Sequence, residues 1–436
     1  MLVSAVMRLW FLATLLLLCA CSAGPPDDDD DDDDDSLVDY TLPQLDCSSS
    51  AGLYEGQATL TTAAEVEEFF ANYNAISGNF SLRGSELSQA PGLGCLVQAE
   101  GEVLVENTQL PFVDLRSLVN IGESLSIHDN PDIRQIAAPN LEIISLFTVL
   151  NSNDRLEAID LSSVHTLRLD PPSNEDSNLH ALQSERNPAL VSFNLDSLRQ
   201  CGGILEFDED DQLTEISLPA LEQVSGAIQI DNLDALLLFD LPSLEQIGGE
   251  LRFDHNGPLH SLFNVPPDQP LTVSAPMLSA VGDRFYVDNN PSAMTMDFSA
   301  LTSVGGEFFL RGSVVLPQLD LGALQSVAGD FLVSEFYAIE DLTLNSLEQV
   351  DGAFSLTLSK QLATMSAPLL ETIAGGLQIT QHDALTNLSF PALESVQGDL
   401  EIRFNPVLPN TEVCEVWAQI GEGLQGDLIS GVGCPL

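Results

Sequence analysis

The sequence has little positive charge. Thirteen lysines and arginines stand against 66 aspartates and glutamates in 436 residues, which gives a formal net charge of −53. A polyanion of this strength repels nucleic acids and anionic lipid head groups at long range, so we expect no nucleic-acid partner. Aromatic residues are also scarce, at 6%, which favours thin stacked layers over one large globular core. The hydrophobic share of 44% excludes a wholly disordered chain.

The sequence also lacks an apolar run of the roughly 20 residues that a transmembrane helix needs. Residues 9–18 are apolar, follow Arg8, and fit the hydrophobic region of a signal peptide. The stretch ends in Leu-Cys-Ala-Cys21, which resembles the bacterial lipobox in the spacing of its aliphatic and small residues before the cysteine. The resemblance implies that Cys21 is lipidated and becomes the mature N-terminus. The alternative is an ordinary secretory signal with an incidental cysteine.

The residues after Cys21 predict a tether at the cell envelope. Ser22 fits the sorting rule for outer-membrane lipoproteins if the cell is Gram-negative, and the lipid would be the only membrane anchor. Residues 27–35 are nine consecutive aspartates, which repel one another and predict an extended spacer. An acidic export tag and weak calcium association remain alternative interpretations. We therefore predict a bacterial envelope location, at the outer membrane or cell surface.

The rest of the sequence repeats with a period of 23 residues. Fourteen units align on an anchor position, and nine of the thirteen steps between anchors are 23 residues long. The anchors are Tyr73, Leu96, Leu118, Leu141, Leu161, Leu198, Leu221, Leu244, Leu278, Leu301, Leu324, Leu347, Leu370 and Leu393. One step has 22 residues and the others have 20, 37 and 34, the long ones indicating loop insertions. A fixed period of this length is typical of a solenoid.

The columns of the repeat predict strands rather than helices. Position +3 after the anchor is apolar in all fourteen units, and positions +7 and +9 are apolar in twelve and thirteen. Because +7 and +9 alternate with polar residues, the pattern has the period of a strand. A second strand-like stretch follows in each unit. Position +5 is glycine in ten units, which indicates a turn with positive φ or close contact with the neighbouring coil.

Both ends of the repeat carry sequences that predict short capping helices. Residues 62–70 predict a helix with Thr62 or Thr61 as its N-cap and Glu65 or Glu67 in its first turn. Residues 411–421 predict a second helix at the other end.

The cysteines fit an exported protein with these two caps. Cys47 and Cys95 bracket the first cap, and Cys414 and Cys434 bracket the second. Because exported proteins keep disulfides, we predict the pairs Cys47–Cys95 and Cys414–Cys434. Cys201 falls in the apolar +3 column, which predicts a buried thiol rather than a nucleophile.

The repeat unit resembles the receptor L domain, a right-handed β-helical module related to leucine-rich repeats, and especially its bacterial relatives. The resemblance rests on the pattern Leu-x-x-Val/Ile-x-Gly-x-Leu-x-Ile, on Asn-Pro turns at Asn130, Asn290 and Asn405, and on the cysteine-bounded caps. It implies an all-β solenoid, a right-handed β-helix of about fourteen coils with short helical caps. Ordinary leucine-rich repeats are the competing interpretation. Fourteen coils exceed one L domain, and receptor signalling is not carried over.

These observations give a domain organisation. We assign residues 1–20 to a lipoprotein signal peptide and 21–46 to the lipid anchor and acidic spacer. Residues 47–405 form the solenoid with its N-terminal cap, and 406–436 form the C-terminal cap.

An acidic column is the first candidate site. Position +10 holds Asp208, Asp231, Asp254 and Asp288 on four successive units, and we expect these side chains to face solvent. The column forms either a solvated acidic surface or a cation site, since stacked carboxylate oxygens suit calcium. The neighbouring Arg252 and Arg284 give a superficial resemblance to pectate-lyase-type enzymes, which use bound calcium and an arginine base.

An apolar column is the second candidate site. Position +8 holds Tyr286, Phe309 and Leu332 on adjacent units, and Phe336 and Tyr337 lie in the turn that follows. A stacked, exposed apolar patch rimmed by charge often marks a partner site. The alternative is that residues 334–338 fold over the patch and cover it.

We predict a non-enzymatic surface lipoprotein that binds or adheres to an unknown protein or glycan at the envelope. No cofactor is expected, except calcium if the acidic column is a cation site. Two alternatives remain: a structural envelope spacer, and a calcium-dependent polysaccharide-acting β-helix enzyme. The sequence contains no Gly-x-Ser-x-Gly, phosphate-binding loop, His-Glu-x-x-His or Cys-x-x-Cys motif.

Overall fold

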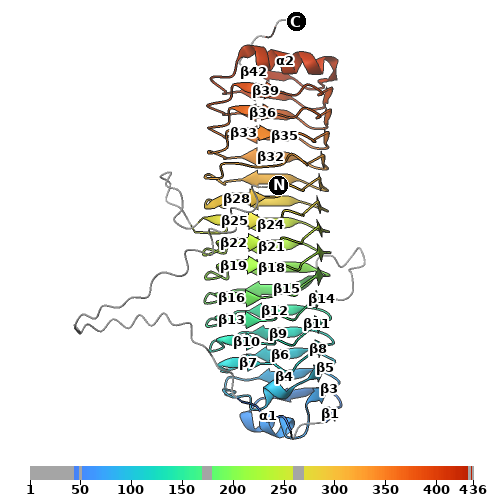
Figure 1. The fold of residues 1–436 in the computed structure, drawn as a ribbon, viewed down its shortest axis with the longest axis vertical. Helices are drawn as coiled ribbons and strands as arrows, with labels where there is room; N and C mark the ends of the chain where they lie inside the picture. Colours follow the sequence, from blue (N-terminus) through green and yellow to red (C-terminus); the bar gives the residue numbers. More distant parts are fainter. Residues whose placement is uncertain (1–43, 49–51, 169–178, 259–269, 431–433, 435–436) are drawn as a thin grey trace, which may run out of the picture. The chain divides into compact units, whose positions relative to one another are not determined.

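The computed structural model describes residues 44–48, 52–168, 179–258, 270–430 and 434. The predicted lipidation at Cys21 and the aspartate spacer lie outside these residues. Gln44–Leu436 form one compact unit, a parallel β-solenoid of about 14 coils (Figure 1). Within the described ranges, no helix has the length and apolarity that crossing a membrane requires.

The first face of the solenoid, called here the long sheet, has 16 parallel strands over the described residues. Its strands are β2 (Ala58–Leu60), β4 (Phe80–Arg83), β6 (Val103–Glu106), β9 (Leu125–His128), β12 (Thr148–Asn151), β15 (His180–Glu185), β18 (Ile204–Asp208), β21 (Ile228–Asp231), β24 (Leu251–Asp254), β27 (Phe285–Asp288), β30 (Phe308–Arg311), β32 (Phe331–Ser334), β35 (Phe354–Thr357), β38 (Leu377–Thr380), β41 (Leu400–Arg403) and β42 (Leu428–Ser430). These strands contain the +7 and +9 positions, whose side chains point inward as the alternating pattern predicts.

The second face, called the narrow sheet, has 15 two-residue strands in the part of the chain that is described. They are β1 (Leu53–Tyr54), β3 (Ala75–Ile76), β5 (Gln98–Ala99), β8 (Asn120–Ile121), β11 (Ile143–Ile144), β14 (Thr166–Leu167), β17 (Gln200–Cys201), β20 (Gln223–Val224), β23 (Gln246–Ile247), β26 (Ala280–Val281), β29 (Ser303–Val304), β31 (Ser326–Val327), β34 (Gln349–Val350), β37 (Thr372–Ile373) and β40 (Ser395–Val396). The +3 column forms this face. Val224, Ile247 and Val304 share one file, paired through Val281.

The third face is split into shorter sheets of four, four and three strands within the described ranges. These are β7 (Phe112–Asp114), β10 (Gln135–Ala137), β13 (Ala158–Asp160) and β16 (Ser192–Asn194), then β19 (Glu215–Ser217), β22 (Leu238–Asp240), β25 (Leu271–Ser274) and β28 (Ala293–Asp297), and finally β33 (Asp341–Thr343), β36 (Thr364–Ser366) and β39 (Asn387–Ser389). The second strand-like stretch of each repeat supplies this face. A regular coil therefore has three strands, one more than the column pattern indicated.

The structure corrects one anchor of the repeat. β14 pairs Leu167 with Ile144, so the anchor of that coil is Val164 rather than Leu161. The irregular steps of 20 and 37 residues become 23 and 34, and both insertions then add eleven residues. The error arose because, in each repeat, the segment that forms the third face is followed by an apolar residue three positions before the anchor. An apolar spacing of three therefore fits two registers.

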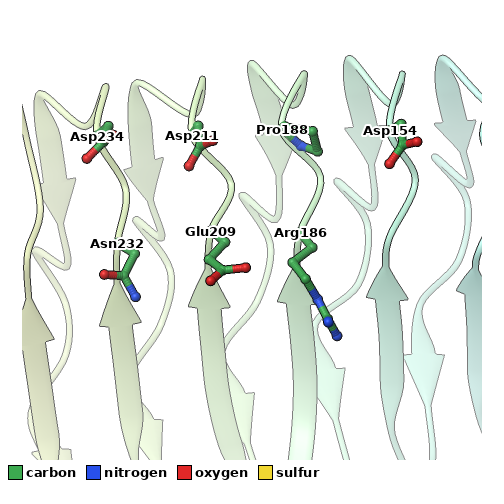
Figure 2. Close-up of a pocket in the computed structure, with 7 residues that line it drawn as sticks. All are labelled: Asp154, Arg186, Pro188, Glu209, Asp211, Asn232 and Asp234. Carbon is green, nitrogen blue, oxygen red and sulfur yellow. The ribbon is translucent and has the colours of Figure 1, made fainter.

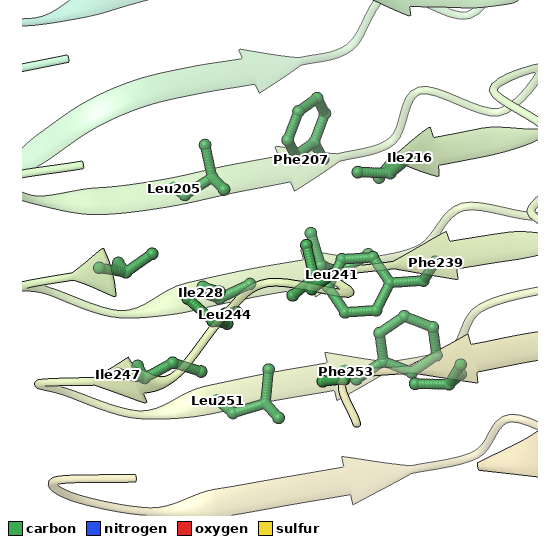
Figure 3. Close-up of a cluster of buried hydrophobic side chains, with 14 of the residues drawn as sticks. Leu205, Phe207, Ile216, Ile228, Phe239, Leu241, Leu244, Ile247, Leu251 and Phe253 are labelled. Carbon is green, nitrogen blue, oxygen red and sulfur yellow. The ribbon is translucent and has the colours of Figure 1, made fainter. Parts of the chain in front are cut away.

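The core between the faces is continuous and almost entirely apolar. Figure 3 shows Phe207, Phe239 and Phe253 from neighbouring coils packed among leucine and isoleucine side chains. Farther along, Phe285, Phe308, Phe331 and Phe354 form one file, with ring centroids 4.7, 5.0 and 4.7 Å apart and nearly parallel planes. Such offset contacts add to the free energy gained by burying the rings. Cys201 lies in this core, and burial raises the pKa of its thiol to about 11.

The glycine column exists because neighbouring coils come too close for a side chain. A Cβ placed on Gly329 would lie 2.8 Å from the carbonyl carbon of Gly306 and 2.9 Å from the nitrogen of Glu307. Gly226 meets the backbone of Gly203 in the same way, at 2.5 Å. Neither glycine has a positive φ. Of the two explanations offered by the sequence, close contact between coils is therefore the correct one.

Most residues with positive φ in the described chain lie in a different column, at position +11, directly after the long-sheet strand. Each of the fourteen coils has one there in the described chain: Gly84, Asn107, Asp129, Ser152, Arg186, Glu209, Asn232, His255, Asn289, Gly312, Glu335, Leu358, Gln381 and Phe404. Only two are glycine, so glycine content gave no signal for this turn. The left-handed residue turns the chain so that position +12 points back into the core.

Position +12 carries a buried polar column in most coils. Asn130, Asn153, Asn187, Asp210, Asn256, Asn290, Ser313, Ser359 and His382 are all fully or almost fully buried there. Asn130 shows the common pattern. Its Oδ1 accepts hydrogen bonds from the backbone N–H and hydroxyl of Thr108, at 2.9 and 2.8 Å, and its Nδ2 donates to the carbonyl of Val105 at 3.0 Å. The side chain thus satisfies backbone groups that the turn leaves unpaired.

His382 replaces asparagine in this column without changing the pattern. Its Nδ1 accepts from the backbone N–H of Ser359 at 3.3 Å, and its Nε2 lies 3.0 Å from the carbonyl of Leu356. This arrangement suits the neutral ring with the proton on Nε2. Burial accordingly lowers the pKa of His382, although the backbone hydrogen bonds oppose the shift.

Asp210 is the exception in this column because a carboxylate cannot donate to a backbone carbonyl. From the preceding coil, the hydroxyl of Ser184 donates to Asp210 Oδ2 at 2.6 Å, and the backbone N–H of Asn187 donates to Oδ1 at 2.9 Å. Ser184 stands at a +9 position that is apolar in the other coils. Burial raises the pKa of Asp210 to about 7, although these hydrogen bonds oppose the shift.

The predicted caps are present at both ends. α1 (Ala63–Phe70) has Thr62 as its N-cap, in a reciprocal capping box with Glu65. α2 (Asn410–Ile420) forms the second cap and packs against β39. The short 3₁₀ helices η2 (Leu93–Cys95) and η3 (Gly421–Gly423) complete the helical segments of the described chain. The disulfides Cys47–Cys95 and Cys414–Cys434 are both formed, as predicted.

The glycine column gives a stability prediction. We expect Gly329→Ala to lower the free energy of unfolding by roughly 1–3 kcal/mol, because the new methyl group meets the backbone of the preceding coil. Gly322→Ala is the matched control, since its nearest contact is the Asp320 carboxylate oxygen at 3.1 Å. Urea titration followed by circular dichroism measures both. Equal midpoints for the two variants would contradict the steric explanation.

Asp210 gives a prediction about pH. The pKa of Asp210 in the folded protein lies above the ordinary value of 3.8. The folded state therefore binds this proton more tightly than the unfolded state, and the resulting stabilisation is fully present below pH 3.8. It is lost as pH rises to about 7, at about 1.4 kcal/mol per pH unit. Asp210→Asn should remove this dependence and unfold at a higher temperature than the parent at pH 8. Thermal melts between pH 4.5 and 8, with Asp240→Asn as the charge-removal control, measure it. Parallel pH profiles for the parent and Asp210→Asn would show that Asp210 is not the responsible group.

Candidate functional site

The outer surface of the long sheet carries the candidate apolar site. Tyr286, Phe309 and Leu332 lie side by side on β27, β30 and β32, in the register that the repeat predicted. The rings of Tyr286 and Phe309 stack with centroids 4.8 Å apart and planes at 19°. All three side chains are partly exposed. We call these three residues the outer stripe.

Arginine side chains cover part of the outer stripe. The Arg284 guanidinium lies 4.0 Å from the centroid of the Tyr286 ring and 5.6 Å from that of Phe309. Arg311 lies 5.5 Å from the centroid of Phe309. Cation–π contacts of this kind are worth about 0.5–1 kcal/mol at exposed sites. The sequence showed the arginines but not that they stack on the rings.

The aspartate column is also in register, since Asp208, Asp231, Asp254 and Asp288 are paired from strand to strand. It does not face solvent as expected. Asp254 and Asp288 are 7% and 1% exposed. The column lies at the strand ends, where neighbouring arginine and tyrosine side chains cover it. The expectation of an open acidic column is therefore wrong for these two residues.

Arginines already supply positive charge to this column. Arg252 donates to Asp231 at 3.0 Å and to Asp254 at 3.3 Å, and Arg311 donates twice to Asp288, at 2.8 and 2.5 Å. Burial raises the pKa of Asp231 to about 6, opposed by Arg252. Across the described ranges, no group of three or more histidine, cysteine, aspartate or glutamate side chains is arranged to hold a metal ion.

Tyr286 connects the two columns. Its hydroxyl donates to Asp288 Oδ2 at 3.0 Å, the same carboxylate that pairs with Arg311. Burial, and then this hydrogen bond to an anionic acceptor, raise the pKa of Tyr286 to about 12. The phenol is therefore neutral near pH 7 and acts here as a hydrogen-bond donor that fixes the ring.

The same sheet surface becomes acidic toward β15 and β18. Glu206 precedes Tyr286 in one file through Gln229 and Arg252, and Glu185 pairs with Asp208 beside it. Burial raises the pKa of Glu185; Arg186 opposes the shift, and Glu206 and Asp208 add to it. We call Glu185, Glu206 and Asp208 the acidic end of the surface.

An acidic groove of about 460 Å³ opens where these strands end. Figure 2 shows Glu209, Arg186 and Asn232 just beyond the strand tips, and a row of turn residues behind them. The groove is lined by Asp154, Arg186, Pro188, Glu209, Asp211, Asn232 and Asp234. Burial, and then the charge of Asp234, raise the pKa of Asp211. The +11 and +13 columns therefore form an electronegative corner next to the acidic end.

The turn that follows the outer stripe places the two predicted aromatic residues in different environments. Phe336 is fully buried because it occupies the +12 position, which the left-handed Glu335 turns into the core. Its prediction as a partner-binding residue is therefore wrong. Tyr337 is partly exposed and lines a groove of about 360 Å³. There the Lys360 ammonium lies 4.9 Å from its ring centroid.

Calorimetry with calcium tests the cation-site interpretation of the aspartate column. Because Arg252 already neutralises Asp231 and Asp254, we expect the Asp231→Asn/Asp254→Asn variant to bind calcium with an affinity within about twofold of the parent. The protein–calcium titration measures both affinities. A loss of tenfold or more in the variant would establish the cation site and favour the enzymatic alternative.

Comparison with known proteins adds little to this geometry. No family model matches the chain, and no curated protein matches it. Among solved structures, the chain is similar to a leucine-rich repeat protein from Bacteroides ovatus at 13% identity, over 80% of this chain and 87% of that one. The TM-score is 0.25, which is too low to support an argument. The solenoid assignment therefore rests on the strand pairing of this chain itself.

Proposed function

We propose that this chain is a lipid-anchored surface protein of the bacterial envelope whose solenoid binds a partner without catalysing a reaction. The lipobox-like Cys21 and the aspartate spacer support the anchoring. In the described part of the chain, sixteen parallel strands present a long sheet surface to a partner. The outer stripe of Tyr286, Phe309 and Leu332 is where that partner docks.

The observation that carries the proposal is the stack of half-exposed apolar side chains fixed by arginines. Tyrosine and arginine are the residue types that most often dominate binding energy at protein interfaces. Tyr286 is held by Asp288 and Arg284, so little side-chain entropy remains to be lost on binding. A surface fixed in this way is ready to bind without rearrangement.

The two alternatives explain less of this surface. A purely structural spacer has no need for three stacked, partly exposed apolar side chains on the outer surface of the long sheet. For a calcium-dependent enzyme, Arg252 would have to act as a base, yet it is engaged with Asp231 and Asp254. Non-enzymatic binding uses the stripe, the arginines and the acids as they are arranged.

The proposal predicts the effect of a charge in the outer stripe. Phe309→Asp places a carboxylate in the outer stripe, close to Glu307. We expect the amount of partner captured from envelope extracts to fall at least tenfold, as measured by quantitative pull-down. Val149→Asp is the matched control, because Val149 occupies the same +8 column on β12 and is also partly exposed. A Phe309→Asp variant that melts like the parent and retains full capture would remove the outer stripe as the binding site.

A further inference from the structure

Over the six successive strands from β18 to β32, the +8 side chains of the long sheet change from acidic to apolar. In order they are Glu206, Gln229, Arg252, Tyr286, Phe309 and Leu332, each paired with the next. Neighbouring strands lie about 4.8 Å apart, so four steps from Glu206 to Phe309 span about 19 Å. An acidic surface and an apolar surface therefore lie on the same sheet surface, with Glu206 and Phe309 four strand spacings apart.

The acidic surface has more carboxylates than cations to pair with them. Arg186 contacts Glu185 at 2.9 Å, and His180 contacts Glu206 at 2.8 Å. Among the described residues, the carboxylate of Asp208 accepts a hydrogen bond only from the neutral amide of Asn232, at 2.8 Å. The adjoining groove adds further carboxylates, with Arg186 as its only cationic lining residue. Burial raises the pKa of Glu185, and the charges of Glu206 and Asp208 add to the shift.

The geometry of the outer stripe argues against a sugar as the occupant. Sugars bind aromatic residues by lying against an open ring face. Here the faces of Tyr286 and Phe309 are turned toward each other, and Arg284 covers Tyr286. Phe309 and Leu332 lie side by side and are partly exposed, an arrangement that suits apolar side chains of a polypeptide.

We propose that the partner is a basic polypeptide segment that lies along the solenoid across this face. This inference rests on the proposed binding function and specifies the chemical class of the partner. Its apolar side chains pack on Phe309 and Leu332, and its lysine or arginine side chains bind Glu206, Asp208 and the adjoining groove. A span of about 19 Å corresponds to roughly 13 residues of α-helix. The net charge of −53 attracts such a segment at long range.

Two synthetic helical peptides of identical composition test the proposal. One carries leucine and phenylalanine near one end and arginines about 13 residues away; the other has the same residues interspersed. Fluorescence anisotropy with the full-length protein in 150 mM salt measures both affinities. We expect the segregated peptide to bind at least tenfold more tightly. Equal affinities would overturn the proposal, because they indicate general attraction to a polyanion.

Matched variants locate the binding of the segregated peptide. Glu206→Gln/Asp208→Asn should weaken it at least fivefold. Glu215→Gln/Asp240→Asn removes the same two charges from the third face and should change the affinity less than twofold. Equal losses in the two variants would overturn the proposal.

The envelope pull-down separates this inference from the proposed function. If partner capture needs Phe309 but is unchanged by Glu206→Gln/Asp208→Asn, the outer stripe binds a partner that is not basic. The proposed function then stands and the present inference fails. If capture is lost in both variants, both are supported.

Discussion

Parallel hydrogen bonding between successive coils is the constraint on which the rest of this structure depends. Each strand pairs with the equivalent strand one coil away, so every column of side chains repeats at about 4.8 Å. Coils must therefore be equal in length and adopt the same backbone turn at the same position. The glycine column, the left-handed residue at +11 and the buried asparagine column all serve this requirement. A single coil could not offset its own loss of chain entropy, and only the stack is stable.

The features that repeat with the period could be predicted from the sequence, and those that depend on one coil could not. The period, the inward +7 and +9 columns, the capping helix that begins near Thr62 and both disulfides were predicted correctly because each has a local or periodic signal. The anchor at Leu161 was misplaced because two apolar columns stand three residues apart. Phe336 was taken as exposed because the left-handed turn before it is formed by Glu335, a residue type that gives no signal for positive φ.

The candidate site likewise has features that the sequence period predicted and features that it could not predict. Columns alone placed Tyr286, Phe309 and Leu332 side by side, and they placed the four aspartates in one file. They could not give the burial of Asp254 and Asp288, which depends on how far Arg252 and Arg311 reach across neighbouring strands. Nor did they reveal that Arg284 lies flat on Tyr286. A long side chain can reach several neighbouring residues, and three-dimensional packing rather than the sequence period determines which of them it contacts.

The two eleven-residue insertions have a consequence of their own. Strands on both sides of each insertion pair in the ordinary register, β12 with β15 and β24 with β27. The only irregularities in the described strand pairing are local shifts that follow the insertions, at His180/Leu182 and at Leu271/Thr272, so the stack continues past each insertion with an adjustment of one strand end. Such a scaffold can gain, lose or exchange surface loops while the paired strands keep their arrangement. Lineages carrying this protein could thus diversify what they display outward while the supporting framework stays constant.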